Sequence, residues 1–143
     1  MSFNILIVDD SNSMRAVIKK IISISGFKMD QCYEAANGRE ALEVLSKNWV
    51  DAIITDINMP EMNGLELLER LHEDEMLRQI PAIVVSTERS EERIEAVMVK
   101  GAKSFIKKPF LPEEIRRQLY DILGVRHEGG YSEDQGTSDD CDF

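Results

Sequence analysis

Short apolar runs alternate with amphipathic stretches along most of the chain. The first apolar run spans residues 4–8, and a stretch with helical spacing follows at 13–25 and stops at Gly26. The same pairing recurs four more times, which predicts five consecutive βα units. The expected strands are 4–8, 31–35, 52–55, 82–85 and 104–106, and the expected helices are 13–25, 38–45, 64–73, 91–100 and 112–123.

The expected strands contain the runs ILIV, AIIT and AIVV, in which polar residues do not alternate with apolar ones. Strands of this kind are buried on both faces, as in a parallel sheet that lies between two layers of helices. Pro112 suits the first turn of the last helix, and Gly124 suits its end. We therefore expect an α/β fold with a five-stranded parallel sheet and helices on both faces.

Composition limits the class of protein. The 143 residues have room for one packed domain, and with 43% hydrophobic and 31% charged residues the chain can bury a core. A net charge of -10 disfavours binding to nucleic acid or to an anionic membrane. Cys32 and Cys141 show neither metal-binding spacing nor a disulfide framework, which favours a reducing cytoplasm. No apolar stretch approaches the roughly 20 residues that a membrane span requires.

The composition changes near the C-terminus. Residues 128–143 contain six acidic residues and no basic ones, together with several glycines and serines. Such a segment lacks the apolar surface needed to pack. The sequence thus predicts a folded domain over residues 1–126 and an acidic, disordered tail over 127–143, with docking of that tail on a basic partner as the alternative.

Reactive side chains follow the expected strands. They are Asp9 and Asp10 after the first, Asp56 after the third, Ser86 and Thr87 after the fourth, and Lys107 and Lys108 after the fifth. Ligands of open parallel sheets bind at the carboxyl ends of the strands, so these groups are expected to converge. Two carboxylates about 4 Å apart repel by roughly 4 kcal/mol at an effective dielectric of 20. A divalent cation with oxygen ligands, Mg²⁺ rather than Ca²⁺, is the expected counterion. The alternative is that these residues are merely solvated loop residues at strand ends.

Four motifs resemble the receiver domain of two-component response regulators. They read LIVDDSNSMR, IITDINMPEMNGLELL, IVVST and FIKKPF, and the resemblance extends over residues 4–124. The single-domain length is most similar to that of the stand-alone, chemotaxis-type receivers. The resemblance implies a flavodoxin-like (βα)5 fold with strand order 2-1-3-4-5, an order that the periodicity alone does not supply. It also implies a cis peptide bond between Lys108 and Pro109.

The resemblance implies that Asp56 accepts a phosphoryl group from a sensor histidine kinase, a phosphotransfer protein or a small acyl phosphate. Lys108 and Ser86 would then contact the phosphoryl oxygens. The implied ligands of Mg²⁺ are Asp9, Asp10, Asp56 and Asn58. Such a protein is a phosphoacceptor that catalyses its own phosphorylation and dephosphorylation, and it is not a conventional enzyme.

Signal output is also implied only by the resemblance. Ser86 and Phe105 would form the switch, and Asn58 and Glu88 would tune hydrolysis. The expected surface for a downstream protein target contains Ile94, Met98 and Phe105, in chemotaxis or in a phosphorelay. Each of these three apolar side chains has an alternative role as part of the core.

Two other functions use similar residues. A small Mg²⁺-dependent phosphatase of the haloacid dehalogenase type also has strand-end aspartates, a Ser or Thr and a lysine. That family opens with a DxD nucleophile strand, whereas here the acidic pair comes first and the acceptor strand reads DIN. A receiver-fold scaffold that is never phosphorylated is the second alternative, and the complete set of strand-end residues disfavours it.

Overall fold

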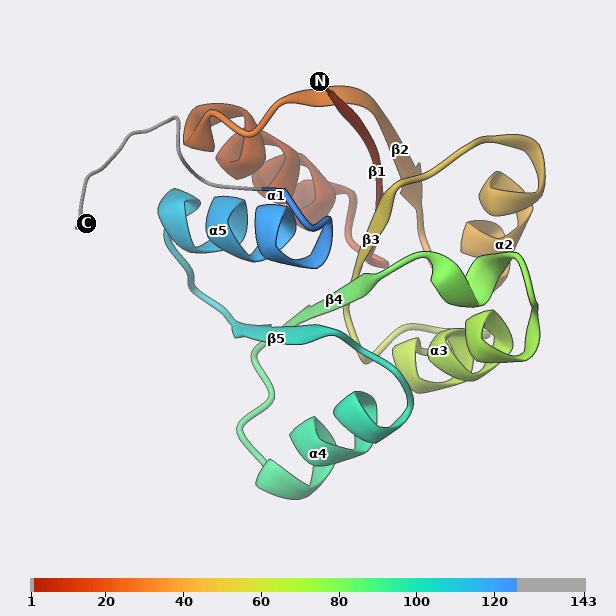
Figure 1. Cartoon of the computed structure of the whole chain (residues 1–143). Coiled ribbons are helices and arrows are strands. Elements are labelled where there is room, and N and C mark those ends of the chain that lie inside the picture. The colour runs from red at the N-terminus through yellow and green to blue at the C-terminus, as the bar shows by residue number, and fades with distance from the viewer. Residues whose placement is uncertain (1, 126–143) are drawn as a thin grey trace.

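The computed structural model describes residues 2–125, and its five strands form one parallel sheet (Figure 1). The strands are β1 (Phe3–Val8), β2 (Met29–Ala35), β3 (Ala52–Thr55), β4 (Ala82–Ser86) and β5 (Ser104–Lys107). Their order is β2-β1-β3-β4-β5, which confirms both the parallel sheet and the strand order that the resemblance implied. Arg126 and the predicted tail over 127–143 lie outside the described residues.

Helices cover both faces of the sheet. They are α1 (Asn12–Ser25), α2 (Gly38–Lys47), α3 (Gly64–Glu73), α4 (Glu91–Val99) and α5 (Pro112–Ile122). Helices α1 and α5 pack on one face, and α2, α3 and α4 on the other (Figure 1). A short 3₁₀ helix, η1 (Leu77–Gln79), precedes β4 and was not predicted, because three residues are too few to show a helical period.

The central strand explains why the sequence shows no polar alternation. Ile5 and Ile7 of β1 belong to the apolar cluster under α1 and α5, whereas Leu6 and Val8 belong to the cluster under α2, α3 and α4. Successive side chains of a strand point to opposite faces, and here both faces are covered. All four of these side chains are at most 1% exposed.

Polar caps fix where the first four helices begin, just beyond the carboxyl edge of the sheet. The side chains of Ser11, Asn37, Asn63 and Ser90 accept hydrogen bonds from backbone N–H groups in the first turns of α1 to α4. Helix α5 begins instead with Pro112, as predicted. Gly26 ends α1 with φ of 87°, a left-handed conformation that favours glycine. The loops between strands and helices are therefore held in place at one edge of the sheet.

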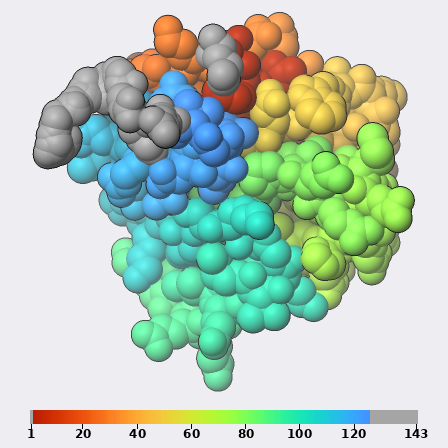
Figure 2. Space-filling view, viewed as in Figure 1, coloured from red at the N-terminus to blue at the C-terminus, as the bar shows by residue number. Residues whose placement is uncertain are grey.

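The molecular surface is shown in Figure 2, where the segment around α4 projects at the bottom of the view. Within the described residues, no helix combines the length and the apolar character that crossing a bilayer requires. The exposed large apolar side chains include Met98 and Val99 near the end of α4 and Leu111 just before α5.

Candidate functional site

Two carboxylates and one ammonium group meet at the carboxyl edge of the sheet. Asp9, Asp56 and Lys108 each directly follow a strand, namely β1, β3 and β5. The Lys108 Nζ lies 3.4 Å from Asp9 Oδ2 and 3.7 Å from Asp56 Oδ2. Lys108 is also followed by a cis bond to Pro109, as the resemblance implied. The predicted convergence of strand-end residues is therefore present for these three.

A network on the β1 side holds Asp9 in place. Its side chain is 4% exposed, and its Oδ1 accepts a hydrogen bond of 2.9 Å from the backbone N–H of Ser11. The buried guanidinium of Arg15 donates to the backbone carbonyl of Asp9 and to the side chain of Asn12. The Nε of Arg15 pairs with Glu34 on β2 at 2.9 Å. Sequence reasoning missed Arg15, because its position within a helix gives no sign that it reaches back to the loop.

The groups around Asp56 shift the pKa of its carboxyl in both directions. Burial raises the pKa of the Asp56 carboxyl above its ordinary value, and the nearby charge of Asp9 adds to the rise. The charge of Lys108 and hydrogen bonds from the backbone N–H of Ile57 (2.7 Å) and from the Ser86 hydroxyl act in the opposite direction. The net rise means that the ionised carboxylate is destabilised at this position, as expected for a group that reacts rather than stabilises.

We expect replacement of Asp56 with asparagine to stabilise the metal-free protein at neutral pH. A carboxyl whose pKa is raised by folding favours the folded state when protonated, and it loses that contribution as the pH rises through the folded-state pKa. The melting temperature of Asp56→Asn should therefore exceed that of the wild type at pH 7 in EDTA. The difference should shrink below about pH 4, where unfolded aspartates are protonated.

The matched control for this measurement is Asp30→Asn, which removes an exposed carboxylate of β2. Its melting temperature should follow that of the wild type at every pH. If Asp56→Asn melts below the wild type at neutral pH, the carboxylate is stabilising and the inferred destabilisation is wrong.

Gly64 fits closely against the backbone of Asp56 and Ile57. A Cβ atom at Gly64 would lie 2.3 Å from the carbonyl oxygen of Asp56 and 3.0 Å from the Cα of Ile57. The N–H of Gly64 donates to the carbonyl of Ile57 at 2.7 Å, so α3 begins directly against this loop. A capping box between Asn63 and Glu66 fixes that first turn. The backbone that carries Asp56 is thus held by the start of α3.

The remaining predicted metal ligands are more exposed. Asp10 is exposed and makes no hydrogen bond or ion pair with the described residues, and the side chain of Asn58 is exposed as well. Across residues 2–125, no group of three or more His, Cys, Asp or Glu is placed to hold a metal ion. The donors at this edge are nevertheless carboxylate and carbonyl oxygens. Mg²⁺ typically uses one or two carboxylates and several waters, so the set Asp9, Asp10 and Asp56 fits Mg²⁺ chemically.

The predicted hydrolysis-tuning residues share one partner. The Oδ1 of Asn58 accepts a hydrogen bond of 3.1 Å from Nη2 of Arg93, and Oε1 of Glu88 pairs with Nε of Arg93 at 3.2 Å. Sequence reasoning missed Arg93. Its spacing from Asn58 is 35 residues, and no local motif relates them.

The predicted switch residues lie on neighbouring strands. Ser86 ends β4 and is 2% exposed, and its hydroxyl accepts from the backbone N–H of Glu88 at 3.1 Å. Phe105 on β5 is partly buried against the apolar cluster under α2, α3 and α4.

The predicted partner surface consists of Phe105 and two residues of α4. Ile94 is partly buried on α4, and Met98 is 40% exposed. The three residues of the predicted partner surface are thus accessible to different extents.

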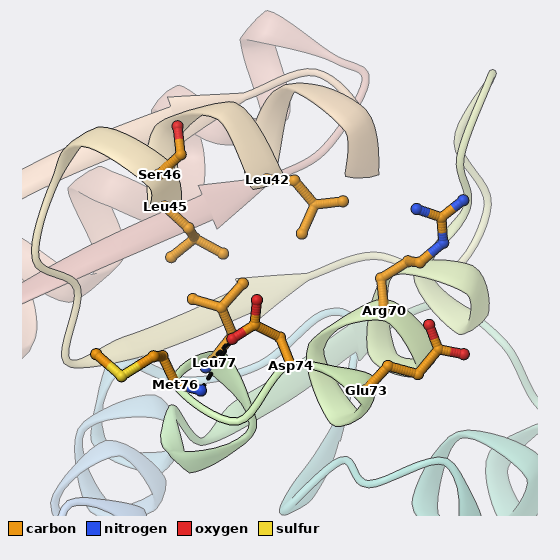
Figure 3. A pocket seen from close by; sticks show the side chains of 8 residues that line it. All are labelled: Leu42, Leu45, Ser46, Arg70, Glu73, Asp74, Met76 and Leu77. Atoms are coloured by element: carbon orange, nitrogen blue, oxygen red, sulfur yellow. Dashed lines mark hydrogen bonds between the residues drawn. The ribbon is translucent and has the colours of Figure 1, made fainter.

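A groove of about 630 Å³ lies at the other edge of the sheet, between α2 and the segment from α3 to η1 (Figure 3). Helices run antiparallel to the strands that they follow, so these helix ends lie away from Asp56. The Asp74 carboxylate in the groove accepts from the backbone N–H groups of Met76 and Leu77, which orders the start of η1. That carboxylate therefore has a structural role.

Comparisons with known proteins agree with this geometry. The family described as "Response regulator receiver domain" matches residues 5–120. A "Chemotaxis protein CheY homolog" of Campylobacter jejuni is 38% identical over 130 residues, which cover 90% of this chain and 98% of that protein. The crystal structure of Vibrio cholerae CheY4 has a TM-score of 0.75 at 32% identity and covers 85% of this chain and 99% of that one. The receiver domain of the Pseudomonas aeruginosa sensor histidine kinase PA1611 was solved with magnesium in its active-site cleft. It has a TM-score of 0.76 at 23% identity and covers 87% of this chain and all of that one.

Proposed function

Because the chain belongs to the response regulator receiver domain family, we propose that it accepts a phosphoryl group on the carboxylate of Asp56. The observation that carries this proposal is the position of Asp56 at the end of β3, beside the Lys108 ammonium at 3.7 Å and next to the Ser86 hydroxyl. The donors are a phosphohistidine of a sensor histidine kinase or phosphotransfer protein, and small acyl phosphates. A protein that receives phosphoryl groups from such donors is expected to act in the cytoplasm.

The transfer forms one bond and breaks one bond. A carboxylate oxygen of Asp56 bonds to phosphorus while the bond from phosphorus to the donor's nitrogen or acyl oxygen breaks, and the electron pair leaves with the donor. Phosphoryl transfer has a loose, in-line transition state with charge spread over the equatorial oxygens, so positioned cations and donors contribute most of the catalysis. Lys108 would pair with one phosphoryl oxygen, and Ser86 would donate a hydrogen bond to another.

Mg²⁺ fits the same edge of the sheet. Asp9, Asp10, Asp56 and the backbone carbonyl of Asn58 would hold it, with waters completing the ligand set. When bound, the ion would neutralise charge on the phosphoryl group and on the carboxylates. Among residues 2–125, Lys108 is the one cation that pairs with both Asp9 and Asp56, so these three side chains together carry an excess of negative charge.

The signal would leave through Ser86, Phe105 and α4. A phosphoryl group adds a charge of about -1.5 to -2 and three strong acceptors, which would draw the Ser86 hydroxyl towards it. Phe105 lies on the strand next to Ser86 and is only partly buried, so it has room to change its packing. Ile94, Met98 and Phe105 would then bind the downstream target, in chemotaxis or in a phosphorelay.

The proposal is tested by incubating the protein with acetyl phosphate and Mg²⁺ and measuring its intact mass. We expect a gain of one phosphoryl group in the wild type, no gain in EDTA and no gain in Asp56→Asn. The control Asp30→Asn should gain mass like the wild type, because Asp30 is an exposed aspartate of β2. If Asp56→Asn also gains a phosphoryl group, the acceptor is another residue and the proposal is wrong. If the wild type gains none under conditions that label another receiver, the proposal is also wrong and a scaffold that is never phosphorylated is favoured.

A further inference from the structure

Arg93, in the first turn of α4, joins the two loops that follow β3 and β4. Its Nη2 donates to Asn58 Oδ1 at 3.1 Å, and its Nε pairs with Glu88 Oε1 at 3.2 Å. Asn58 lies two residues after Asp56, and Glu88 lies two residues after Ser86. One guanidinium group therefore connects both loops beside the acceptor carboxylate.

Glu88 is held at both of its carboxylate oxygens. While Oε1 pairs with Arg93, Oε2 accepts a hydrogen bond of 3.0 Å from the backbone N–H of Ser90. The backbone N–H of Glu88 donates to the Ser86 hydroxyl at 3.1 Å. The side chain of Glu88 is only 19% exposed, compared with 46% for Arg93. These contacts fix the Glu88 carboxylate in one orientation, two residues after Ser86.

Arginine suits this connection better than lysine does. The guanidinium is planar and carries several N–H donors in a fixed arrangement, so two different nitrogens can bind two acceptors at once. The start of α4 fixes the position of Arg93, because the Ser90 hydroxyl accepts from the backbone N–H of Arg93 at 3.4 Å. The acceptors on Asn58 and Glu88 are thus bound by a group that is itself anchored.

We propose that Arg93 is a positioning residue that prolongs the life of the phosphoryl group on Asp56 by holding the side chains of Asn58 and Glu88 together across the entrance to the site. This inference rests on the proposed function. In hydrolysis, the oxygen of water bonds to phosphorus, and the bond between phosphorus and the Asp56 oxygen breaks. The Asp56 carboxylate keeps the electron pair, and both hydrogens of the water leave with inorganic phosphate.

The direction of the effect follows from the acceptors that Arg93 occupies. Without Arg93, Glu88 Oε1 and Asn58 Oδ1 lose their partner and become free to accept hydrogen bonds from water near the phosphoryl group. A carboxylate that orients water assists its attack. The two loops also lose their connection, which opens the path of water to Asp56. Arg93 therefore slows hydrolysis.

The test measures phosphoryl lifetime in the whole chain. Protein labelled with acetyl phosphate and Mg²⁺ is freed of acetyl phosphate by rapid desalting, and the loss of the phosphoryl group is followed by intact mass. We expect Arg93→Ala to lose it about fivefold faster than the wild type, the rate factor that corresponds to one well-formed exposed ion pair. Arg93→Lys keeps a cation within reach of Glu88 and should recover part of the lifetime.

Two controls separate this effect from a loss of charge or stability. Arg89→Ala removes an exposed arginine of the loop that contains Glu88, with no partner among the described residues, and this variant should lose its phosphoryl group at the wild-type rate. In a Glu88→Ala background, Arg93→Ala should change the decay rate less than it does alone, because contacting residues are not additive. Melting temperatures of all variants identify any that are unfolded.

The outcomes also separate this proposal from the proposed function. If the wild type gains no phosphoryl group, the proposed function fails. If the wild type is labelled and folded Arg93→Ala decays at the wild-type rate, or no faster than Arg89→Ala, the role of Arg93 is wrong while phosphorylation of Asp56 stands. If Arg93→Ala speeds the loss of the phosphoryl group as much in the Glu88→Ala background as it does alone, Arg93 does not act through Glu88.

Discussion

Replacement of Lys108 with alanine is expected to lower the rate of phosphorylation by acetyl phosphate roughly 100-fold, the size of effect seen when one preorganised electrostatic group is removed from an active site. The Lys108 side chain is 12% exposed and lies within 4 Å of both Asp9 and Asp56. Its loss removes the charge that lowers the pKa of Asp56, so the ionised carboxylate is destabilised further. It also removes the cation that would meet the incoming phosphoryl group.

The matched control is Lys107→Ala. Lys107 is the neighbouring residue on β5, is exposed and carries the same charge, but it makes no ion pair with the described residues. Initial rates of mass gain should therefore be near the wild-type value for Lys107→Ala and far below it for Lys108→Ala. Equal rates in the two variants would mean that the ammonium beside Asp56 has no part in the transfer.

Replacement of Gly64 with alanine should have the largest effect on stability, a loss of about 3 kcal/mol in the free energy of unfolding, because the added methyl group overpacks a rigid site. The new Cβ would meet the backbone oxygen of Asp56 at 2.3 Å and the Cα of Ile57 at 3.0 Å, and neither atom can rotate away. The start of α3 and the loop after β3 must separate, which also displaces Asp56. Urea unfolding measures the first effect, and mass gain with acetyl phosphate measures the second.

Gly38 provides a control at the equivalent position of another helix. It begins α2 as Gly64 begins α3, and an added Cβ would lie 2.6 Å from a side-chain atom of Met62. The Met62 side chain can change rotamer, but its Cβ, at 3.0 Å, moves only with the backbone, so Gly38→Ala should cost about 1–2 kcal/mol, less than Gly64→Ala. If the two alanine variants are equally stable and equally reactive, the close approach at Gly64 does not constrain the site.

The fold could be predicted largely because its signals are local. The unbroken apolar runs indicated strands buried on both faces, and Gly26 and Pro112 marked helix ends where the structure has them. The order of the strands was implied only by the resemblance, because periodicity carries no information on which strands pair. The fourth helix was expected to include Lys100, but α4 ends at Val99 and Lys100 caps it.

Only those residues of the candidate site that directly follow a strand could be predicted from the sequence. Asp9, Asp56 and Lys108 follow strands directly, so a parallel sheet brings them to one edge. Arg15 and Arg93 reach the same edge from helices, and their contacts depend on side-chain paths that no local pattern records. Asp10 follows a strand too, but its exposed side chain shows that adjacency in sequence does not determine burial.

The order of the strands allows the site to come apart while most of the sheet stays folded. Asp9 and Asp56 follow the inner strands β1 and β3, whereas Lys108 follows the outer strand β5, which within the described residues pairs with β4 alone. Proteins open locally in cooperative units, and edge elements with few partners need less free energy to open than the centre does. Detachment of β5 would remove the lysine from both carboxylates while the central strands stay paired. Local opening of β5 would therefore take the site apart without global unfolding.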